Sequence, residues 1–306
     1  MAEASQGAQA QLCVEPGSSP HTFDGNSEPY EFLRENLTEK IEVLDRNTIR
    51  GTRSHHSRGT RFGNNRVGGT ILMNPSPNDL DLWLPRILGA SESTDTFALA
   101  ETLPYFGVMI DRVAKVHSYA DCKVNRAIFR GQAGGLVELE LDIIAKSHSV
   151  SNAGSFPSLT LGVAAADQPY AFTDGAFTFA SSARKTKQFE LTIDNALDGR
   201  FTNSRNATSI TPQNRIISLR TTHPYSSDET DLLAQSLYGA AGTIVLTPVG
   251  GGMSGVSTTF TFGVLQNQDE DPAVGGKQEI DLVLNMIARM TSTTRELVVT
   301  HDPVAA

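Results

Sequence analysis

The sequence predicts a mainly β protein with two tandem antiparallel β-sandwich or partly closed barrel domains, each with one covering α-helix. Three observations predict this fold class. Most apolar segments alternate apolar with polar residues, as strands with one buried face do. Two segments instead have the apolar spacing of amphipathic helices. These segments recur in the same order in both halves of the chain, so a duplicated β domain is expected.

The stretch FELTID, residues 189–194, shows the strand pattern most clearly. Its Phe, Leu and Ile fall on one face of a strand, and its Glu, Thr and Asp fall on the other. VELELDII (137–144) and QEIDLVLNM (278–286) alternate in the same way. We expect one face of each sheet to lie in a core and the other face to stay outside it. Further strands are expected at 68–75, 106–116, 122–130, 176–180, 215–224, 243–248 and 258–265.

Helices are expected at residues 77–89 and 227–239, and they carry the clearest part of the repeat. Each has apolar residues at the spacing of one helical stripe, which would cover a sheet. The stripes match position by position, and each ends at a glycine, Gly89 or Gly239. A glycine there suits a left-handed residue at the helix C-terminus.

The ends of both helices have recognisable signals. Ser76 before Pro77 predicts one N-terminus, and Ser226 with Glu229 has the spacing of a capping box at the other. Pro85 conflicts with its helix, because it removes one hydrogen bond. We expect it to kink or shorten that helix.

The repeat divides the chain into three parts. Residues 1–28 are rich in Ser, Gly, Ala and Pro and suggest a flexible N-terminal arm. The first β domain is expected at 29–152 and the second at 153–306.

Composition excludes several classes of protein. The net charge of −9 argues against a DNA-binding grip, because contacts to phosphates call for basic residues. Cys13 and Cys122 are too few for a disulfide framework or a thiolate zinc site. No apolar run approaches the ~18 residues of a membrane span, and the N-terminus lacks signal-peptide regions. We therefore expect a protein made and used inside a cell, without a membrane.

No segment has the pattern of an active site. GGGMSG (250–255) matches the glycine spacing of a dinucleotide-binding motif, but a strand is expected after it instead of the helix that would bind the phosphates. NQDEDP (267–272) lacks the ligand alternation and the central glycine of a calcium loop. The sequence predicts no catalytic residue, no cofactor and no metal, and hence no enzyme.

Residues 46–66 form an unusual basic segment with six arginines and no acid. Three interpretations remain open. The segment is a solvated hairpin, or it docks on an acidic surface of a neighbouring copy, where the arginine fork suits carboxylates. A nucleic-acid grip is the third, and the acidic remainder of the chain weakens it. The candidate contact residues are Arg46, Arg50, Arg53, Arg58, Arg61 and Arg66.

Several segments together resemble the tail tube proteins of long-tailed, siphovirus-type bacteriophages. They are EPYEFLRENLTEKIEVLDRNTIRGTRSH (28–55), GGTILMNPSPNDLDLWLPRILG (68–89), LPYFGVMIDRV (103–113), PYAFTDGAFTF (169–179) and FELTIDNALDGRFTNSR (189–205). The resemblance covers residues 28–303 and rests on the order and spacing of these segments. It implies the tube fold and rings that stack into a hollow conduit for DNA ejection. It also implies a place in the virion tail after assembly in the host cytoplasm.

The expected partners follow from that resemblance. The chain would associate with itself, as three chains whose six halves make a pseudo-six-fold ring, or as hexamers. A tape measure protein and the tail terminator and tip proteins would be its other protein partners. Double-stranded DNA would pass through without specific binding.

The polar faces of the alternating strands are candidates for the bore. An acidic wall repels DNA only weakly, since a charge pair at about 8 Å in water costs ~0.5 kcal/mol before screening. A basic wall would instead hold phosphates. The arm 1–28 and the loop 46–66 are the candidates for contacts between rings. The candidate lumen-facing acids are Glu138, Glu140, Asp142, Glu190, Asp194, Glu279 and Asp281.

Two alternatives remain. The same fold serves tubes of other injection or secretion systems and tail terminators. A duplicated β-sandwich that binds carbohydrate or a host receptor belongs to another class and should expose clustered aromatic residues. The only Trp, Trp83, lies in a helical stripe instead.

Overall fold

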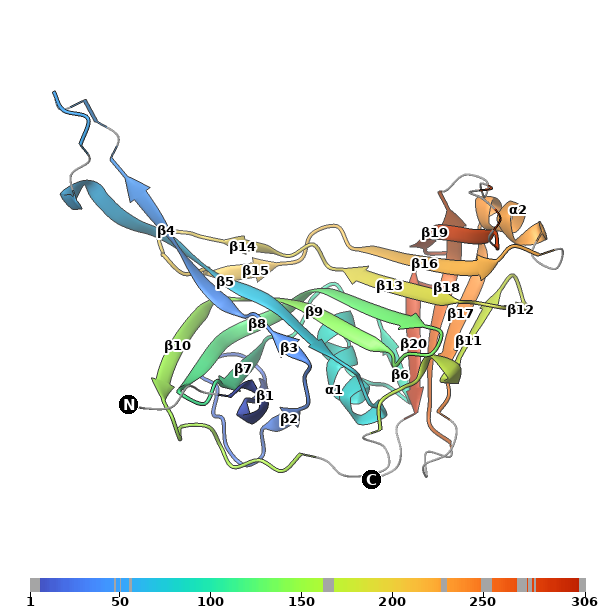
Figure 1. The fold of residues 1–306 in the computed structure, drawn as a ribbon, viewed down its shortest axis with the longest axis horizontal. Helices are drawn as coiled ribbons and strands as arrows, with labels where there is room; N and C mark the ends of the chain where they lie inside the picture. Colours follow the sequence, from blue (N-terminus) through green and yellow to red (C-terminus); the bar gives the residue numbers. More distant parts are fainter. Residues whose placement is uncertain are drawn as a thin grey trace.

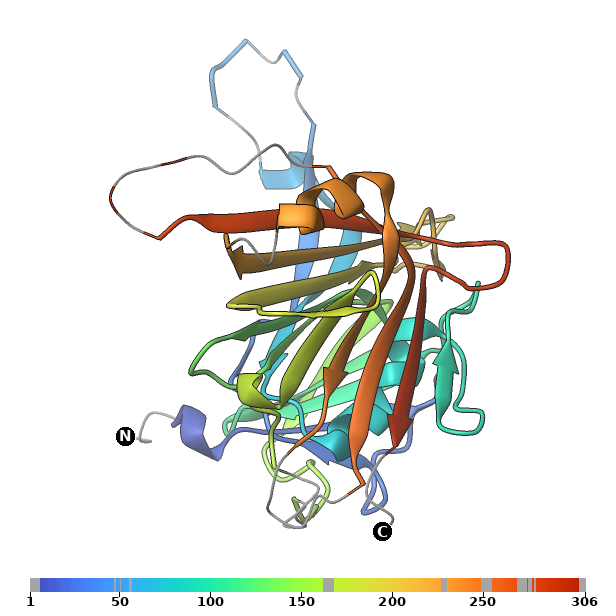
Figure 2. The ribbon, with the colours of Figure 1, turned by 90° about the vertical axis from the view of Figure 1, so that its right-hand side faces the viewer.

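The computed structural model describes residues 6–46, 48–49, 51–54, 57–161, 168–226, 230–248, 255–268, 274, 277 and 279–302. In this part of the chain the protein is mainly β, as the sequence predicts, with twenty strands and two α-helices. All strands pair antiparallel, and the sheets form two layers that cross each other (Figures 1 and 2).

One long sheet runs through both halves of the chain (Figure 1). Its strands in spatial order are β4 (Thr38–Asp45), β5 (Thr60–Met73), β9 (Glu138–Ala145), β8 (Lys115–Gln132), β13 (Gln188–Asp194), β16 (Ile216–Pro224), β19 (Asp281–Arg289) and the last residues of β18 (Ser257–Asn267). The central contact is between β8 and β13, because it joins the first half to the second.

The second layer shares β8 and β18 with the long sheet. β8 pairs with β7 and β10 through its first half and with β9 and β13 through its second. β18 lies between β17 and β20 before it reaches β19. One group of this layer is β2 (Glu28–Tyr30), β1 (Gln11–Pro16), β7 (Phe106–Asp111), β8 and β10 (Ser147–Asn152). The other is β12 (Ser182–Arg184), β11 (Gly175–Phe179), β17 (Ala240–Leu246), β18, β20 (Leu297–Asp302) and β6 (Thr96–Ala98).

The remaining elements are short. The two-residue β3 (Arg34–Glu35) pairs with β5, and β14 (Asp198–Arg200) and β15 (Ser209–Thr211) form a separate hairpin. The 3₁₀ turns are η1 (Gly7–Gln9), η2 (Ser57–Gly59) and η4 (Phe172–Asp174).

Both halves of the long sheet have the same order of strands. The first reads β4, β5, β9, β8, and the second reads β13, β16, β19, β18. In each, a helix follows the second strand. A single cluster of buried side chains nevertheless extends through both halves. We keep the division into domains at 29–152 and 153–306 as an interpretation of this order.

The alternation in the sequence predicts the buried face correctly. Leu191 and Ile193 of β13 are fully buried, as are Leu139 and Leu141 of β9. Burying such a side chain stabilises the fold by about 1.5–3 kcal/mol. Trp83 is also fully buried, on α1, and its ring lies 5.7 Å from that of Phe106.

The first helix, α1 (Pro77–Leu88), begins as predicted. Ser76 and Asp79 form a capping box, and Gly89 ends the helix with a φ of 95°. The helix continues through Pro85 to Leu88, because only one hydrogen bond is lost so near the end and the buried stripe holds the last turn.

The second helix, α2 (Thr230–Tyr238), packs on β18 and β19, whereas α1 packs on β8 and β6. Gly239 has the expected positive φ, 82°. Glu229, the second residue of the proposed capping box with Ser226, lies outside the described residues, as do most of GGGMSG and of NQDEDP.

The structure corrects part of the expected flexible arm at 1–28. Residues 11–16 form β1, which pairs with β7 and β2, and Leu12, Cys13 and Val14 are buried. Burial raises the pKa of the Cys13 thiol to about 12. The arm interpretation overlooked this short apolar run. Deleting 1–28 would therefore remove a core strand and would not isolate a contact between rings.

Buried hydrogen bonds also join the halves. Asn195, after β13, donates to the carbonyls of Ile87 and Val124 at 3.1 and 3.2 Å. His301 of β20 lies 3.0 Å from the Pro77 carbonyl through Nε2 and 2.7 Å from Thr258 Oγ1 through Nδ1. A carbonyl only accepts, so Nε2 carries the proton and neutral His301 accepts from Thr258.

Acid should weaken this contact. Burial lowers the pKa of His301 below its usual 6.5 and outweighs the bond to Pro77, which raises it. Below about pH 6.5 the unfolded chain therefore binds more protons than the folded one, and stability falls as pH falls through this window.

We predict that His301→Leu is less stable than the wild type near pH 7.5 and has a weaker pH dependence between about pH 7 and 5. One titrating group gives a slope of at most about 1.4 kcal/mol per pH unit. Urea unfolding of both proteins across this range measures the difference. Equal slopes would show that His301 does not titrate differently on folding.

Candidate functional site

The predicted acids gather on the exposed side of the long sheet, which we call the charged face. It comprises the outward residues of β9, β8, β13, β16 and β19. β9 contributes Glu138, Glu140 and Asp142, which alternate with the buried Leu139 and Leu141. Likewise, Glu190 and Asp194 lie on β13, Asp281 begins β19, and Glu279 precedes it by two residues.

The charged face is not uniformly acidic. Strand register places Arg130 beside Glu190 on one neighbouring strand and Glu138 on the other. Arg126 likewise lies beside Asp194 on β13 and Asp142 on β9. Sequence reasoning missed these cations. The signal was present in their period-2 spacing on β8, but the strands that neighbour β8 are distant in the sequence.

Arg130 makes the best-defined polar contacts on this face. Its Nε donates to Glu190 Oε2 at 2.8 Å and its Nη1 to Glu140 Oε2 at 2.7 Å. Burial lowers the pKa of Arg130, but the hydrogen bonds to Glu140 and Glu190 outweigh it and raise the pKa. The guanidinium thus bridges β9, β8 and β13.

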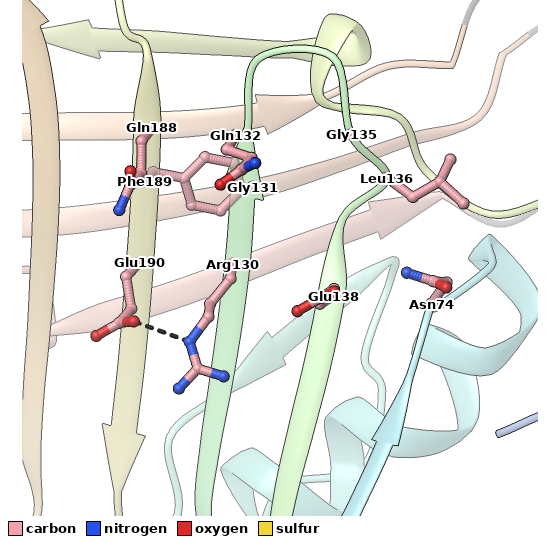
Figure 3. A pocket seen from close by; sticks show the side chains of 10 residues that line it. All are labelled: Asn74, Arg130, Gly131, Gln132, Gly135, Leu136, Glu138, Gln188, Phe189 and Glu190. Atoms are coloured by element: carbon pink, nitrogen blue, oxygen red, sulfur yellow. Dashed lines mark hydrogen bonds and ion pairs between the residues drawn. The ribbon is translucent and has the colours of Figure 1, made fainter. Parts of the chain in front are cut away.

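A pocket of about 420 Å³ lies beside this bridge, at the end of β8 (Figure 3). Arg130, Glu138 and Glu190 line one side of it, and Leu136 and Phe189 line another. Of the polar side chains that line it, Arg130 and Glu190 bind each other, so we treat the pocket as a part of the charged face.

The arginine-rich segment is the tip of a hairpin made by β4 and β5, which extends away from the body of the protein (Figure 1). Its described arginines are exposed. They are Arg46, Arg53, Arg58, Arg61 and Arg66, and Arg50 lies outside the described residues.

The same hairpin carries large apolar side chains in solvent. Val43 and Phe62 are 59% and 64% exposed, and Ile41 and Leu44 are also exposed. An edge strand with such residues is prone to pair with another chain. At the other end of the long sheet, α2 exposes Leu237 and Tyr238, the latter to 91%. Figure 1 shows these two regions at opposite ends of the molecule.

A cluster of ring residues lies at the base of the hairpin. His117 Nδ1 and His148 Nε2 are 3.0 Å apart, and His148 Nδ1 lies 3.2 Å from Glu39 Oε2. Burial lowers the pKa of His117. Among the described residues, no three metal-ligating side chains converge on one point. Neither helix in the described ranges has the length and apolar character of a membrane span.

The fold and these surfaces define a β-rich protein with two exposed sheet ends. The phage tail tube protein family matches residues 2–288, nearly the whole chain, and the protein belongs to this family. It is a structural component of the phage tail that assembles with itself. Curated proteins yield no match.

The β8–β13 contact between the halves contains a glycine, Gly131, which also lines the pocket beside Arg130. A Cβ on Gly131 would lie 2.5 Å from Phe189 Cε1 and 3.1 Å from Phe172 Cδ2. Gly131 pairs with Phe189 across the β8–β13 contact.

We predict that Gly131→Ala lowers the free energy of unfolding by about 1–3 kcal/mol, because the methyl group displaces two packed rings. Gly135→Ala is the control, since its Cβ would meet nothing closer than 3.5 Å. Denaturant unfolding compares the two. Equal stabilities would show that the rings adapt without cost.

Proposed function

We propose that this chain forms the tail tube of a long-tailed phage as stacked rings around the DNA that is ejected into the host. The long sheet that runs through both halves supports this proposal best. Its β8–β13 contact has the form that a contact between neighbouring subunits would take, since both join the end of one four-strand unit to the start of the next.

In this proposal, β4 of one copy meets the β18–β19 end and α2 of the next. The exposed Ile41 and Val43 on one side and Leu237 and Tyr238 on the other supply apolar surface. Such a head-to-tail contact is heterologous and closes into a ring when the rotation per chain is right. Two four-strand units per chain favour three chains, with six units in the ring, over six chains.

A loop of the second half supports a role for the arginine-rich hairpin tip. Residues 195–215 connect β13 to β16, as the tip connects β4 to β5, and they reach across onto the first half. The backbone N–H of Asn65 donates to the Arg205 carbonyl at 2.7 Å, and the Arg205 guanidinium lies 5.3 Å from the centre of the Phe62 ring. We infer that the tip reaches a neighbouring copy in the same way, with its arginines on carboxylates.

The charged face would line the bore, with the seven predicted acids and the arginines between them. Double-stranded DNA would pass over it without specific binding. The tape measure, terminator and tip proteins would contact the tube ends. The host cytoplasm would be the place of assembly.

We predict that Ile41→Lys/Val43→Lys stops ring formation but leaves the chain folded, because both side chains are solvent-exposed in the single copy. Val150→Lys, at a residue 52% exposed on β10, is the matched control. Negative-stain microscopy and sedimentation measure assembly. Hollow rods of the double variant would contradict the proposed edge.

We also predict that Arg53→Glu/Arg61→Glu loses assembly, because it lowers the formal charge of residues 46–66 from +6 to +2. The matched variant Arg34→Glu/Arg200→Glu makes the same charge change at exposed residues outside the tip. Only the first should prevent polymerisation, most clearly at low salt. Rods from both would leave the tip as a solvated hairpin.

A further inference from the structure

Two cations on or beside the charged face, Arg130 and Lys187, each contact two carboxylates. Arg130 lies on β8, and the two carboxylates that bind it come from the strands on either side, β9 and β13. About a third of its side chain is exposed, with Glu190 exposed to a similar degree and Glu140 less. Figure 3 shows the contact between Arg130 and the carboxylate of Glu190 on the neighbouring strand.

A second cation also contacts two carboxylates, both from the segment that begins β19. Lys187 Nζ, next to β13, lies 2.7 Å from Glu279 Oε2 and 2.6 Å from Asp281 Oδ1. The hydrogen bonds to Asp281 and Glu279 raise the pKa of Lys187. Each cation is thus bound by two carboxylates, and each group of three side chains has a net charge of −1.

This arrangement exceeds what stability requires. Ion pairs with a third of the side chain in solvent contribute little to stability, because water screens them. A second carboxylate beside a cation that one carboxylate already neutralises is repelled by the first carboxylate. The second acid extends the bridge to a third strand, and it also covers a second edge of the guanidinium.

A guanidinium on the wall of a DNA channel would slow the passage of the DNA by binding its phosphates. Its planar fork binds phosphate oxygens in pairs, and each such contact would retard the DNA. In Arg130, Nε and one Nη already donate to carboxylates, and the net negative charge of the group repels phosphate.

We propose that Glu140 and Glu190 mask Arg130 against DNA phosphates, so that the charged face joins its strands through a cation without becoming adhesive to nucleic acid. This inference rests on the proposed function, in which the charged face lines the bore. Glu279 and Asp281 mask Lys187 in the same way.

The test is the double variant Glu140→Gln/Glu190→Gln, which keeps the side-chain shapes and changes the net charge of the group from −1 to +1. We expect rods of this variant to retain a short labelled DNA duplex on the order of tenfold more than wild-type rods at low salt. The excess should vanish as salt rises, because the gained contact is electrostatic.

Two further variants make the result specific. Adding Arg130→Gln to the double variant should return retention to the wild-type level, since the unmasked cation is gone. Glu31→Gln/Glu92→Gln removes the same formal charge at exposed residues outside the charged face and should leave retention unchanged. Circular dichroism and thermal unfolding confirm that each variant is folded, and the single variant Glu190→Gln replaces the double variant if that one unfolds.

The outcomes separate this inference from the proposed function. If rods form and the double variant retains no more DNA than the wild type, masking is wrong and the tube stands. If retention rises equally in the triple variant or in the Glu31 and Glu92 control, the gain is general charge, and masking is also wrong. If no rods form, the proposed function fails. The soluble chains are then compared for binding to the duplex. Tighter binding by the double variant than by the wild type, lost again in the triple variant, would support masking of Arg130 even without the tube.

Discussion

The pairing of β8 with β13 is the constraint on which the other features of the structure depend. β8 is a single strand of 18 residues that leaves one layer and enters the other, with a register shift between Val124 and Arg126. Only its second half meets β13, over seven residue pairs, with Phe189 packed above Gly131. This contact turns two four-strand units into one sheet. It therefore fixes the direction of the charged face and the distance between the two ends.

The face and the two ends of the long sheet differ in their physical properties. The face is charged, and on it Arg130 is bound by Glu140 and Glu190. The ends are apolar and exposed, as with Val43 and Tyr238, and are unfavourable in water until another chain covers them. A single copy therefore has the features of a part that is completed by its neighbours, which agrees with its membership of a tail tube family.

The sequence predicts what depends on local periodicity and fails where distant strands meet. The faces of β9 and β13 and the limits of α1 follow from alternation, the capping box and Gly89. β1 is too short to stand out in a polar segment, and β4 is exposed on both faces, so neither has a clear pattern. The outward direction of the acids on β9 and β13 follows from the period alone. Their pairing with Arg130 does not, because Glu140 and Glu190 reach it from two other strands.

Joining two units in one chain changes how a ring can form. If the ring has six units from three chains, every second contact between units is the internal β8–β13 pairing, which forms when the chain folds. Only the remaining contacts depend on concentration, because a covalent link makes the internal one unimolecular. The two kinds of contact then need not be alike. The internal one can be closed by buried groups such as Asn195, which would be costly to leave unpaired on a free subunit. The external one must instead be soluble before assembly, and an arginine-rich tip on a partly apolar hairpin combines solubility with a surface that a neighbour can bind.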